Sequence, residues 1–203
     1  MSTALKRRLL TEEEYLLIER QSEDRSEYFR GEMFSMSGAT RSHNVIASKI
    51  SRLLQNQLDG RGCDVYQSDM KVRVNASGRF TYPDVVVVCG ERQYLDERED
   101  VLLNPTVLVE VLSESTANYD RGEKSRDYRM LGSLGDLLIV AQDQPLVEHH
   151  VRQDKNTWNL ATVHGLDATI QLPSISCTLR LADVFAGIEF VDHSRPTLRV
   201  AEG

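Results

Sequence analysis

Two acidic residues stand against runs of apolar β-forming residues, where a lone carboxylate is unusual. Asp84 directly precedes four valines, and Glu110 lies in the middle of a Val/Leu run. Continuous runs of this kind predict strands that are covered on both faces. Burying an ionised carboxylate there is costly unless a cation or hydrogen bonds compensate it. If the two strands are neighbours, a hard divalent cation would stabilise the two like charges, so the pair predicts metal-assisted chemistry.

Phosphodiester hydrolysis with a Mg²⁺-type ion needs oxygen ligands, an activated water and positive charge near the developing anion. The carbonyl of Val111 could be a third ligand beside the two carboxylates. Asp120, Lys124 and Tyr128 recur at helical spacing and therefore share one helix face. A helical side chain leans toward its own N-terminus, which would aim Lys124 back at the strand that feeds the helix. Its ammonium could then orient the attacking water or neutralise charge at the scissile phosphate.

Each of these residues also has a structural interpretation. Asp120 and Lys124 could form a solvated ion pair worth only about 0.3–0.5 kcal/mol. Asp84 could be a turn or cap residue, and Glu110 could pair with a buried Arg or Lys. His43, in the first turn of a helix, could approach a phosphate or a metal-bound water, or it could be a surface or capping residue.

The elements that must position these side chains follow from periodicity, caps and turn residues. Thr11 and Glu14 form a capping-box pattern, which predicts a helix from Glu12 to about Arg20. The next elements are expected to be a hairpin turning at Arg30-Gly31, a helix opened by Ser42 and stopped by Gly60, and the strands Cys63–Val74 and Arg79–Cys89. The Glu110 strand follows, and then a helix that is capped by Ser115 or Thr116 and reaches about Leu131. The last elements are expected to be the strands Asp136–Ala141, Leu146–Val151, Trp158–Val163 and Thr169–Leu172, and a final helix Leu179–Phe185. This order predicts a mixed α/β sandwich, with parallel pairing where the helix to Leu131 is a crossover.

The composition is that of an ordinary globular protein of one domain, expected over residues 11–190 between a flexible N-terminus (1–10) and a flexible tail (191–203). The formal net charge of -7 argues against a general nucleic-acid coat protein but not against a nuclease with a local basic groove. The three cysteines are far apart and lack CxxC spacing, which argues against zinc and against a disulfide framework, so a cytoplasmic location is the default. No signal sequence or membrane-spanning segment is expected.

Several motifs resemble those of the Uma-two family of the PD-(D/E)XK, or restriction-endonuclease-like, superfamily. The matching segments are Arg25-Ser26-Glu27-Tyr28 with Gly31-Glu32 and His43, Tyr82-Pro83-Asp84-Val85, Pro105 to Thr116, and Asp120-Arg121-Gly122-Glu123-Lys124 with Tyr128. The resemblance covers roughly Thr11 to Phe185. It implies a restriction-endonuclease-like α/β fold: a mixed central sheet flanked by helices, with an N-terminal β-hairpin and extra C-terminal strands.

The resemblance also implies roles for particular residues. Asp84 and Glu110 would be the metal ligands. Leu112 stands where the superfamily's usual motif carries Lys, and Lys124 matches a position to which the lysine has moved in this family. Glu32 or Glu27 could be the additional N-terminal acid that many relatives use.

The leading hypothesis is therefore a nuclease that uses Mg²⁺, or Mn²⁺ as a substitute, to hydrolyse DNA phosphodiester bonds, with Asp84, Glu110 and Lys124 as catalytic residues and Glu32, His43, Asp120 and Tyr128 as supporting ones. A homodimer is compatible with cutting two strands. The alternative is a catalytically inactive nuclease-fold module that binds nucleic acid or protein, favoured by the acidic charge and by Leu112.

Overall fold

The apolar runs next to Asp84 and Glu110 form adjacent central strands of a six-stranded mixed sheet. The structure is a computed structural model that describes residues 8–36, 38–113 and 119–190. The strand order of this main sheet is β11 (Trp158–His164), β10 (Leu146–Arg152), β9 (Asp136–Val140), β8 (Val107–Val111), β6 (Val85–Cys89) and β3 (Cys63–Gln67). The expected flexible ends fall largely on residues 1–7 and 191–203, outside the described residues.

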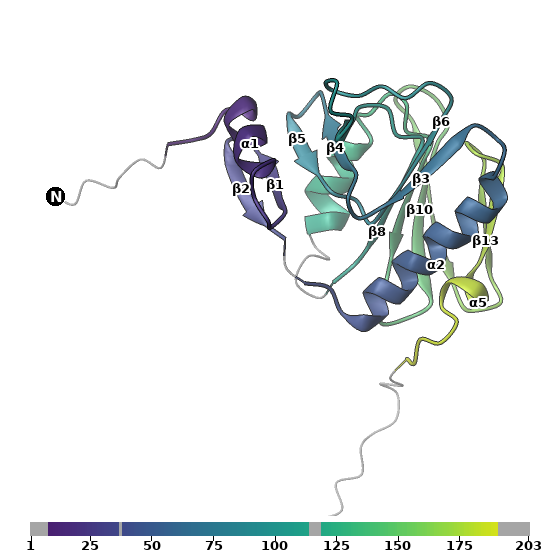
Figure 1. Ribbon diagram of the computed structural model, residues 1–203. Helices are drawn as coiled ribbons and strands as arrows, with labels where there is room; N and C mark the ends of the chain where they lie inside the picture. The colour runs from purple at the N-terminus through teal and green to yellow at the C-terminus, as the bar shows by residue number, and fades with distance from the viewer. Residues whose placement is uncertain (1–7, 37, 114–118, 191–203) are drawn as a thin grey trace, which may run out of the picture.

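Two smaller sheets and short helices complete the fold. The five-stranded sheet has the order β2 (Glu32–Ser35), β1 (Ser26–Phe29), β5 (Arg79–Thr81), β4 (Lys71–Val74) and β7 (Val101–Leu102), and β12 (Thr169–Leu172) pairs with β13 (Cys177–Arg180). The helices are α1 (Glu12–Glu19), α2 (Arg41–Leu58), the π-helix η1 (Asp120–Lys124), α4 (Ser125–Tyr128) and α5 (Leu181–Val184). In Figure 1, α2 lies across one side of the main sheet with β13 and α5 beside it, and the N-terminal hairpin lies next to β5.

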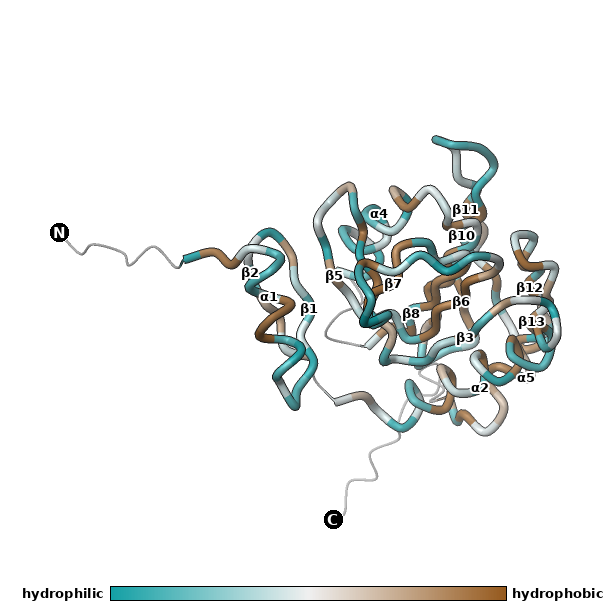
Figure 2. Tube along the Cα trace, turned by 45° about the horizontal axis from the view of Figure 1, so that its top comes forward, coloured by the Kyte–Doolittle hydropathy of each residue, from teal (hydrophilic) through white to brown (hydrophobic). Residues whose placement is uncertain are grey.

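The main sheet is buried on both faces, as the valine runs predict. Val85, Val87 and Val109 pack in one apolar cluster with the inner side of α2, while Val86 and Leu108 pack in a second cluster with β4 and α4. Successive residues of a strand point to opposite faces, so even-numbered and odd-numbered residues of one strand pack against different layers. The tube representation accordingly shows hydrophobic residues along β6 and β8 (Figure 2). Glu110 is two positions after Leu108 on β8, so it points to the same face, toward the layer that contains η1 and α4.

The predicted fold class is confirmed, including the hairpin at Arg30-Gly31 and the capping box at the start of α1. Thr11 accepts a hydrogen bond from the Glu14 amide, and the Glu14 carboxylate accepts one from the Thr11 amide. The expected parallel pairing is formed by β8 and β9, which the segment containing η1 and α4 connects.

Two long predicted strands are each divided between two sheets. The segment Cys63–Val74 separates into β3 and β4 because Ser68 adopts a positive φ and its amide turns to the carbonyl of Asp84. Arg79–Cys89 separates into β5 and β6 at Pro83, which has no amide hydrogen for the ladder.

Three helix predictions need correction. The cap of α2 is Thr40 and not Ser42, because the Thr40 hydroxyl accepts from the His43 amide. The predicted final helix is shorter, since its first residues continue the β12–β13 hairpin. In the segment expected to be one helix up to Leu131, the structure forms η1 and then α4, and the predicted caps Ser115 and Thr116 lie outside the described residues.

The expectation that the cysteines form no disulfide is wrong for Cys63 and Cys89. These residues are opposite each other in the β3–β6 ladder, and their sulfur atoms are joined. Their wide separation in sequence concealed this neighbourhood, which depends on strand pairing. Cys177 is a buried free cysteine.

Across the three described ranges, no helix is both long enough and apolar enough to cross a membrane.

We expect Leu54→Ala to lower the free energy of unfolding by about 2–5 kcal/mol, because Leu54 is fully buried between α2 and the main sheet. The exposed Asn56→Ala on the same helix is the matched control and should change it by less than about 0.5 kcal/mol. Urea denaturation followed by circular dichroism measures both values. Equal effects of the two substitutions would contradict the packing described for α2.

Reduction of the Cys63–Cys89 disulfide should lower the free energy of unfolding by about 2–4 kcal/mol, because the bond closes a loop between residues 26 apart in sequence. Denaturation with and without a reductant measures the difference. The control is the double variant Cys63→Ser/Cys89→Ser, whose midpoint should not respond to reductant. A wild-type midpoint that is equally unresponsive would show that the bond does not form in solution.

Candidate active site

Asp84 and Glu110 converge at one end of the β6–β8 pair. The two strands are antiparallel with Val85 opposite Val109, so Asp84 and Glu110 are the next opposed positions. The Asp84 Oδ2 atom accepts a hydrogen bond of 2.7 Å from the Val111 amide, which fixes Asp84 against β8. Two carboxyl groups that are 26 residues apart in sequence therefore share one site.

Lys124 of η1 lies at the centre of this site. Its Nζ atom is 2.9 Å from Oε1 of Glu110 and 2.9 Å from Oε1 of Glu27, and it is 3.8 Å from Oδ1 of Asp120. Lys124, Glu110 and Asp120 are all buried. The interpretation of Asp120 and Lys124 as a solvated pair therefore does not describe this arrangement.

Hydroxyl groups hold the carboxylates around Lys124. Tyr128, one turn after Lys124, donates to Oε1 of Glu110, and its hydroxyl is 3.1 Å from that of Thr81. Thr81 donates to Oε1 of Glu27, which also accepts from the Tyr82 amide at 3.2 Å. The carboxylates of Glu27 and Glu110 are thus fixed from both the β5 side and the α4 side.

His43 contacts Asp84 from the first turn of α2. Its Nε2 atom is 3.2 Å from Oδ2 of Asp84. Burial alone would lower the pKa of His43, but the hydrogen bond to Asp84, the charge of Asp84 and the backbone of Val111 together raise it. Of the two interpretations of His43, the contact with the acidic site is the one that the geometry supports.

The site holds more negative than positive groups. Burial raises the pKa of Glu110 to about 8, an effect that Lys124 opposes and that the charges of Asp120, Asp84 and Glu27 strengthen. Burial would lower the pKa of Lys124, but Glu110 and Glu27 hold it well above its usual value. Lys124 is therefore held in its charged form, and its ammonium lies among the carboxyl groups of Glu27, Glu110 and Asp120.

The donor atoms suit a hard divalent cation. Oδ1 of Asp84 and Oε2 of Glu110 accept no hydrogen bond from the residues that the structure describes, and Val111, whose carbonyl is the third candidate ligand, directly follows Glu110 in sequence. All three are oxygen donors of the kind that Mg²⁺ and Mn²⁺ prefer. Within the described ranges, no group of three or more His, Cys, Asp and Glu side chains is placed so that it could hold a metal ion. The protein would therefore supply part of the coordination shell, and water or substrate oxygens the rest.

Of the two N-terminal acids considered, the structure brings Glu27 and not Glu32 to the site. Glu32 is exposed on the edge strand β2, opposite Phe29. On β1, Tyr28 points into the N-terminal core cluster, so its neighbour Glu27 points to the opposite face and reaches Lys124. The alternation of side chains along β1 was the sequence signal for the direction of Glu27. It does not predict the pairing of β1 with β5, which brings Glu27 to Thr81.

The wide turn of η1 is the feature that sequence spacing missed entirely. Single π-turns often occur at functional sites, and this one spans Asp120 to Lys124 directly before α4. The spacing of Lys124 and Tyr128 predicts that they share one helix face, and in the structure both side chains contact Glu110.

Comparison with known proteins finds a matching family, related sequences and a related fold. A family model described as "Uma2: Putative restriction endonuclease" matches residues 12–182. Two uncharacterized proteins of Synechocystis sp. are each 33% identical to this chain: sll1609, aligned over 81% of this chain and 93% of its own, and slr1290, aligned over 89% and 94%. The crystal structure of "a putative nuclease belonging to DUF820" from Anabaena variabilis has a TM-score of 0.67 at 18% identity, covering 87% of this chain and 97% of that one, and supports the fold.

The family match spans all the strands that carry the candidate residues, and the Synechocystis relatives align over most of the chain. The protein therefore belongs to the Uma2 family of restriction-endonuclease-like proteins.

Proposed function

We propose that this protein is a divalent-metal-dependent nuclease that hydrolyses DNA phosphodiester bonds. The observation that carries the proposal is the buried Lys124 ammonium, which lies 2.9 Å from Glu110 on the strand next to Asp84. A carboxylate pair with a positioned cation matches the needs of phosphodiester hydrolysis. The family, described as "Putative restriction endonuclease", and the fold shared with the Anabaena protein, described as "a putative nuclease", support the same reaction class.

Asp84, Glu110 and the Val111 carbonyl would hold the metal ion, Mg²⁺ or Mn²⁺. When bound, such an ion polarises a phosphoryl oxygen and lowers the pKa of a coordinated water. The free oxygen of each carboxylate is the atom available for this role, since the other oxygen is already hydrogen-bonded.

Lys124 supplies the positive charge that comes from the protein and not from the metal ion. Glu27 and Glu110 fix its Nζ atom from two sides, so the ammonium is preorganised to orient a water molecule or to stabilise charge on the scissile phosphate. Glu27 is a positioning residue in this proposal, because it acts through Lys124. Tyr128 and His43 position the carboxylates of Glu110 and Asp84, respectively.

The alternative function is a nucleic-acid-binding or protein-binding module without catalysis. Leu112, which takes the place of the usual lysine, is buried in the apolar cluster beside α4 and cannot provide the missing charge. In the nuclease proposal Lys124 replaces that charge, and in the alternative it only neutralises buried acids. A homodimer with one site for each DNA strand is the assembly we propose for the nuclease. The location we propose is the cytoplasm, where the thiols of Cys63 and Cys89 would be kept reduced.

Glu110→Gln, Lys124→Met and Glu27→Gln should each reduce Mg²⁺-dependent cleavage of plasmid DNA by about a hundredfold or more. The reason is that each removes a metal ligand, the fixed cation or the group that fixes it. Glu32→Gln is the matched control, because Glu32 is an exposed acid of the same hairpin as Glu27 and should leave the rate unchanged. Equal cleavage by all four variants and wild type would eliminate the proposed site.

Mg²⁺ or Mn²⁺ should raise the melting temperature of the wild-type protein in a concentration-dependent way. Mass action stabilises the folded state by about 2.7 kcal/mol when the metal is at about a hundred times its dissociation constant. Asp84→Asn and Glu110→Gln should abolish the metal-dependent rise, whatever their melting temperatures without metal, and Glu32→Gln should retain it. If neither ion changes the melting temperature of the wild-type protein, the non-catalytic module is the better explanation.

A further inference from the structure

Helix α2 is a basic element of an acidic protein. The chain has 31 Asp and Glu residues against 24 Lys and Arg residues, yet the 18 residues of α2 include Arg41, Lys49 and Arg52 and no acidic residue. The first turn also lacks the acidic side chains that usually complement a helix N-terminus. This charge pattern is not explained by packing, because the apolar side of α2 already covers the main sheet.

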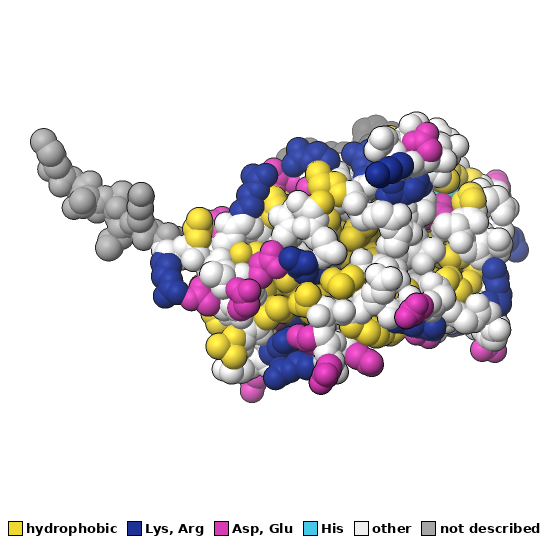
Figure 3. Space-filling model, turned by 90° about the horizontal axis from the view of Figure 1, so that it is seen from above, with side chains coloured by type: hydrophobic (Ala, Val, Ile, Leu, Met, Phe, Trp, Pro, Cys, Tyr) yellow, Lys and Arg dark blue, Asp and Glu magenta, His cyan; other side chains and the backbone are white. Residues whose placement is uncertain are grey.

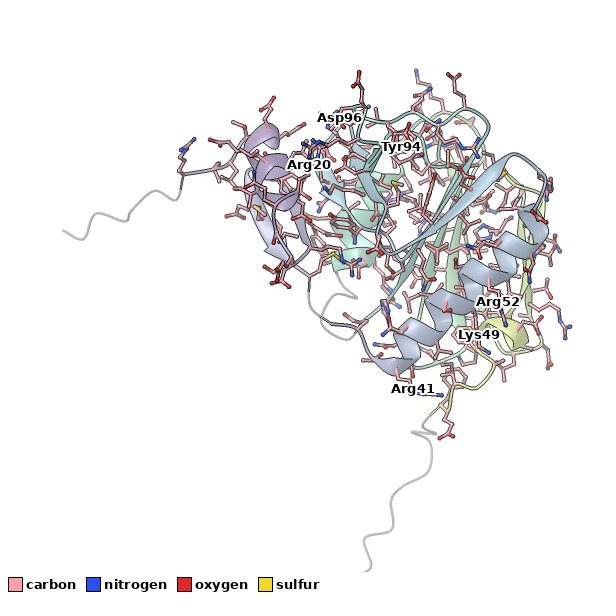
Figure 4. The ribbon with its side chains drawn as sticks, in the orientation of Figure 1. Arg20, Arg41, Lys49, Arg52, Tyr94 and Asp96 are labelled. Atoms are coloured by element: carbon pink, nitrogen blue, oxygen red, sulfur yellow. A yellow bond between two sulfur atoms is a disulfide. The ribbon has the colours of Figure 1, made fainter. Side chains whose placement is uncertain are left out.

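The three basic side chains form one stripe on the solvent side of α2. Residues 41, 49 and 52 lie within less than a third of a turn of one another around the helix axis. Figure 4 shows Arg41, Lys49 and Arg52 along α2 from its start to its middle. Arg41 and Arg52 are exposed and Lys49 is half-buried. The opposite side of the helix carries the buried Ile46, Ile50 and Leu54.

The charges of this stripe are not neutralised within the described part of the protein. Among residues 8–36, 38–113 and 119–190, none of the three basic side chains forms an ion pair, and only Arg41 makes a hydrogen bond, to the Gly187 carbonyl at 3.5 Å. Arg20, in contrast, lies beside Asp96 (Figure 4) and pairs with Asp96 and Asp100 at 2.8 and 2.6 Å. On the face shown in Figure 3, basic and acidic side chains are likewise interspersed.

We propose that the solvent side of α2 is the surface that holds the DNA backbone, with Lys49 and Arg52 contacting phosphates on the way to the active site. The inference rests on the proposed nuclease function. Helix α2 begins at the active site, because His43 in its first turn contacts Asp84. From Arg41 to Arg52 the helix rises about 16 Å, which equals the rise of about five base-pair steps. A duplex strand lying along the stripe would therefore meet several cations before it reaches the acidic site.

Charge chemistry favours a polyanion over other occupants of this surface. The exposed positions between and beyond the basic residues are the uncharged Asn44, Ser48, Gln55 and Asn56, so the stripe offers hydrogen-bond donors and no apolar patch for a protein partner. Contacts of this type fix the position of a duplex and carry no sequence information. The surface would therefore serve DNA of any sequence.

The test compares DNA binding by wild type, Lys49→Gln/Arg52→Gln and the matched control Arg98→Gln/Lys155→Gln, which removes one exposed Lys and one exposed Arg from distant loops. Binding of a fluorescent duplex is measured in EDTA at several salt concentrations, and cleavage is measured in parallel with Mg²⁺. Loss of two phosphate contacts should make the slope of log K against log salt shallower by about 1.8 and weaken binding about tenfold or more at about 0.1 M salt. The control should keep the wild-type slope.

Several outcomes would overturn the inference. One is a wild-type slope in the Lys49→Gln/Arg52→Gln variant, and another is no binding of the duplex by wild type. A third is an altered sedimentation coefficient with unchanged DNA affinity, which would make α2 an interface between copies of the chain. If wild type cleaves DNA and the α2 variant binds normally, the surface is wrong and the nuclease stands. If binding depends on α2 but wild type never cleaves, the nuclease is wrong and the surface stands.

Discussion

One buried ammonium group among carboxylates is the interaction on which the arrangement of the site depends. Lys124 bridges Glu27 of the N-terminal hairpin and Glu110 of the main sheet, so it ties together three segments that are far apart in sequence. Removing one partner of a buried ion pair leaves an uncompensated charge and costs about 3–5 kcal/mol. The five-stranded sheet, η1 and β8 must therefore keep their mutual positions for the charges to remain paired. In the proposed nuclease, the carboxyl groups around this ammonium would also bind the metal ion.

The sequence was most informative where burial leaves few alternatives. Val85–Val88 and the Val/Leu run around Glu110 have no polar face, so they had to form strands covered on both sides. Once those strands are neighbours, the period of two places Asp84 and Glu110 opposite each other on one face. The helical spacing of Lys124 and Tyr128 likewise predicted that they share one helix face, and in the structure both contact Glu110. Predicting where these residues lie required only local periodicity and one strand pairing.

Features that depend on contacts between distant segments could not be derived in this way. Glu27 and Glu32 belong to the same hairpin and share one of its faces, but Glu27 lies on β1, which pairs with β5, whereas Glu32 lies on the edge strand β2. The pairing of Cys63 with Cys89 follows from the β3–β6 register, which cysteine spacing does not encode. The π-turn at Asp120 and the strand break at Ser68 are backbone adjustments with no periodic signal.

The separation of charge within the fold follows from the chemistry of its proposed substrate. A site rich in carboxylates repels phosphates at short range, and a single ammonium that is already shared by two glutamates cannot attract a duplex. Affinity for a polyanion must then come from cations outside the site, because counterion release depends on contacts along the backbone. An acid-free helix whose first turn touches Asp84 satisfies both requirements, since its cations can guide a strand toward the site and form no ion pair with the proposed metal ligands. The acidic net charge of the chain is therefore compatible with DNA as a substrate.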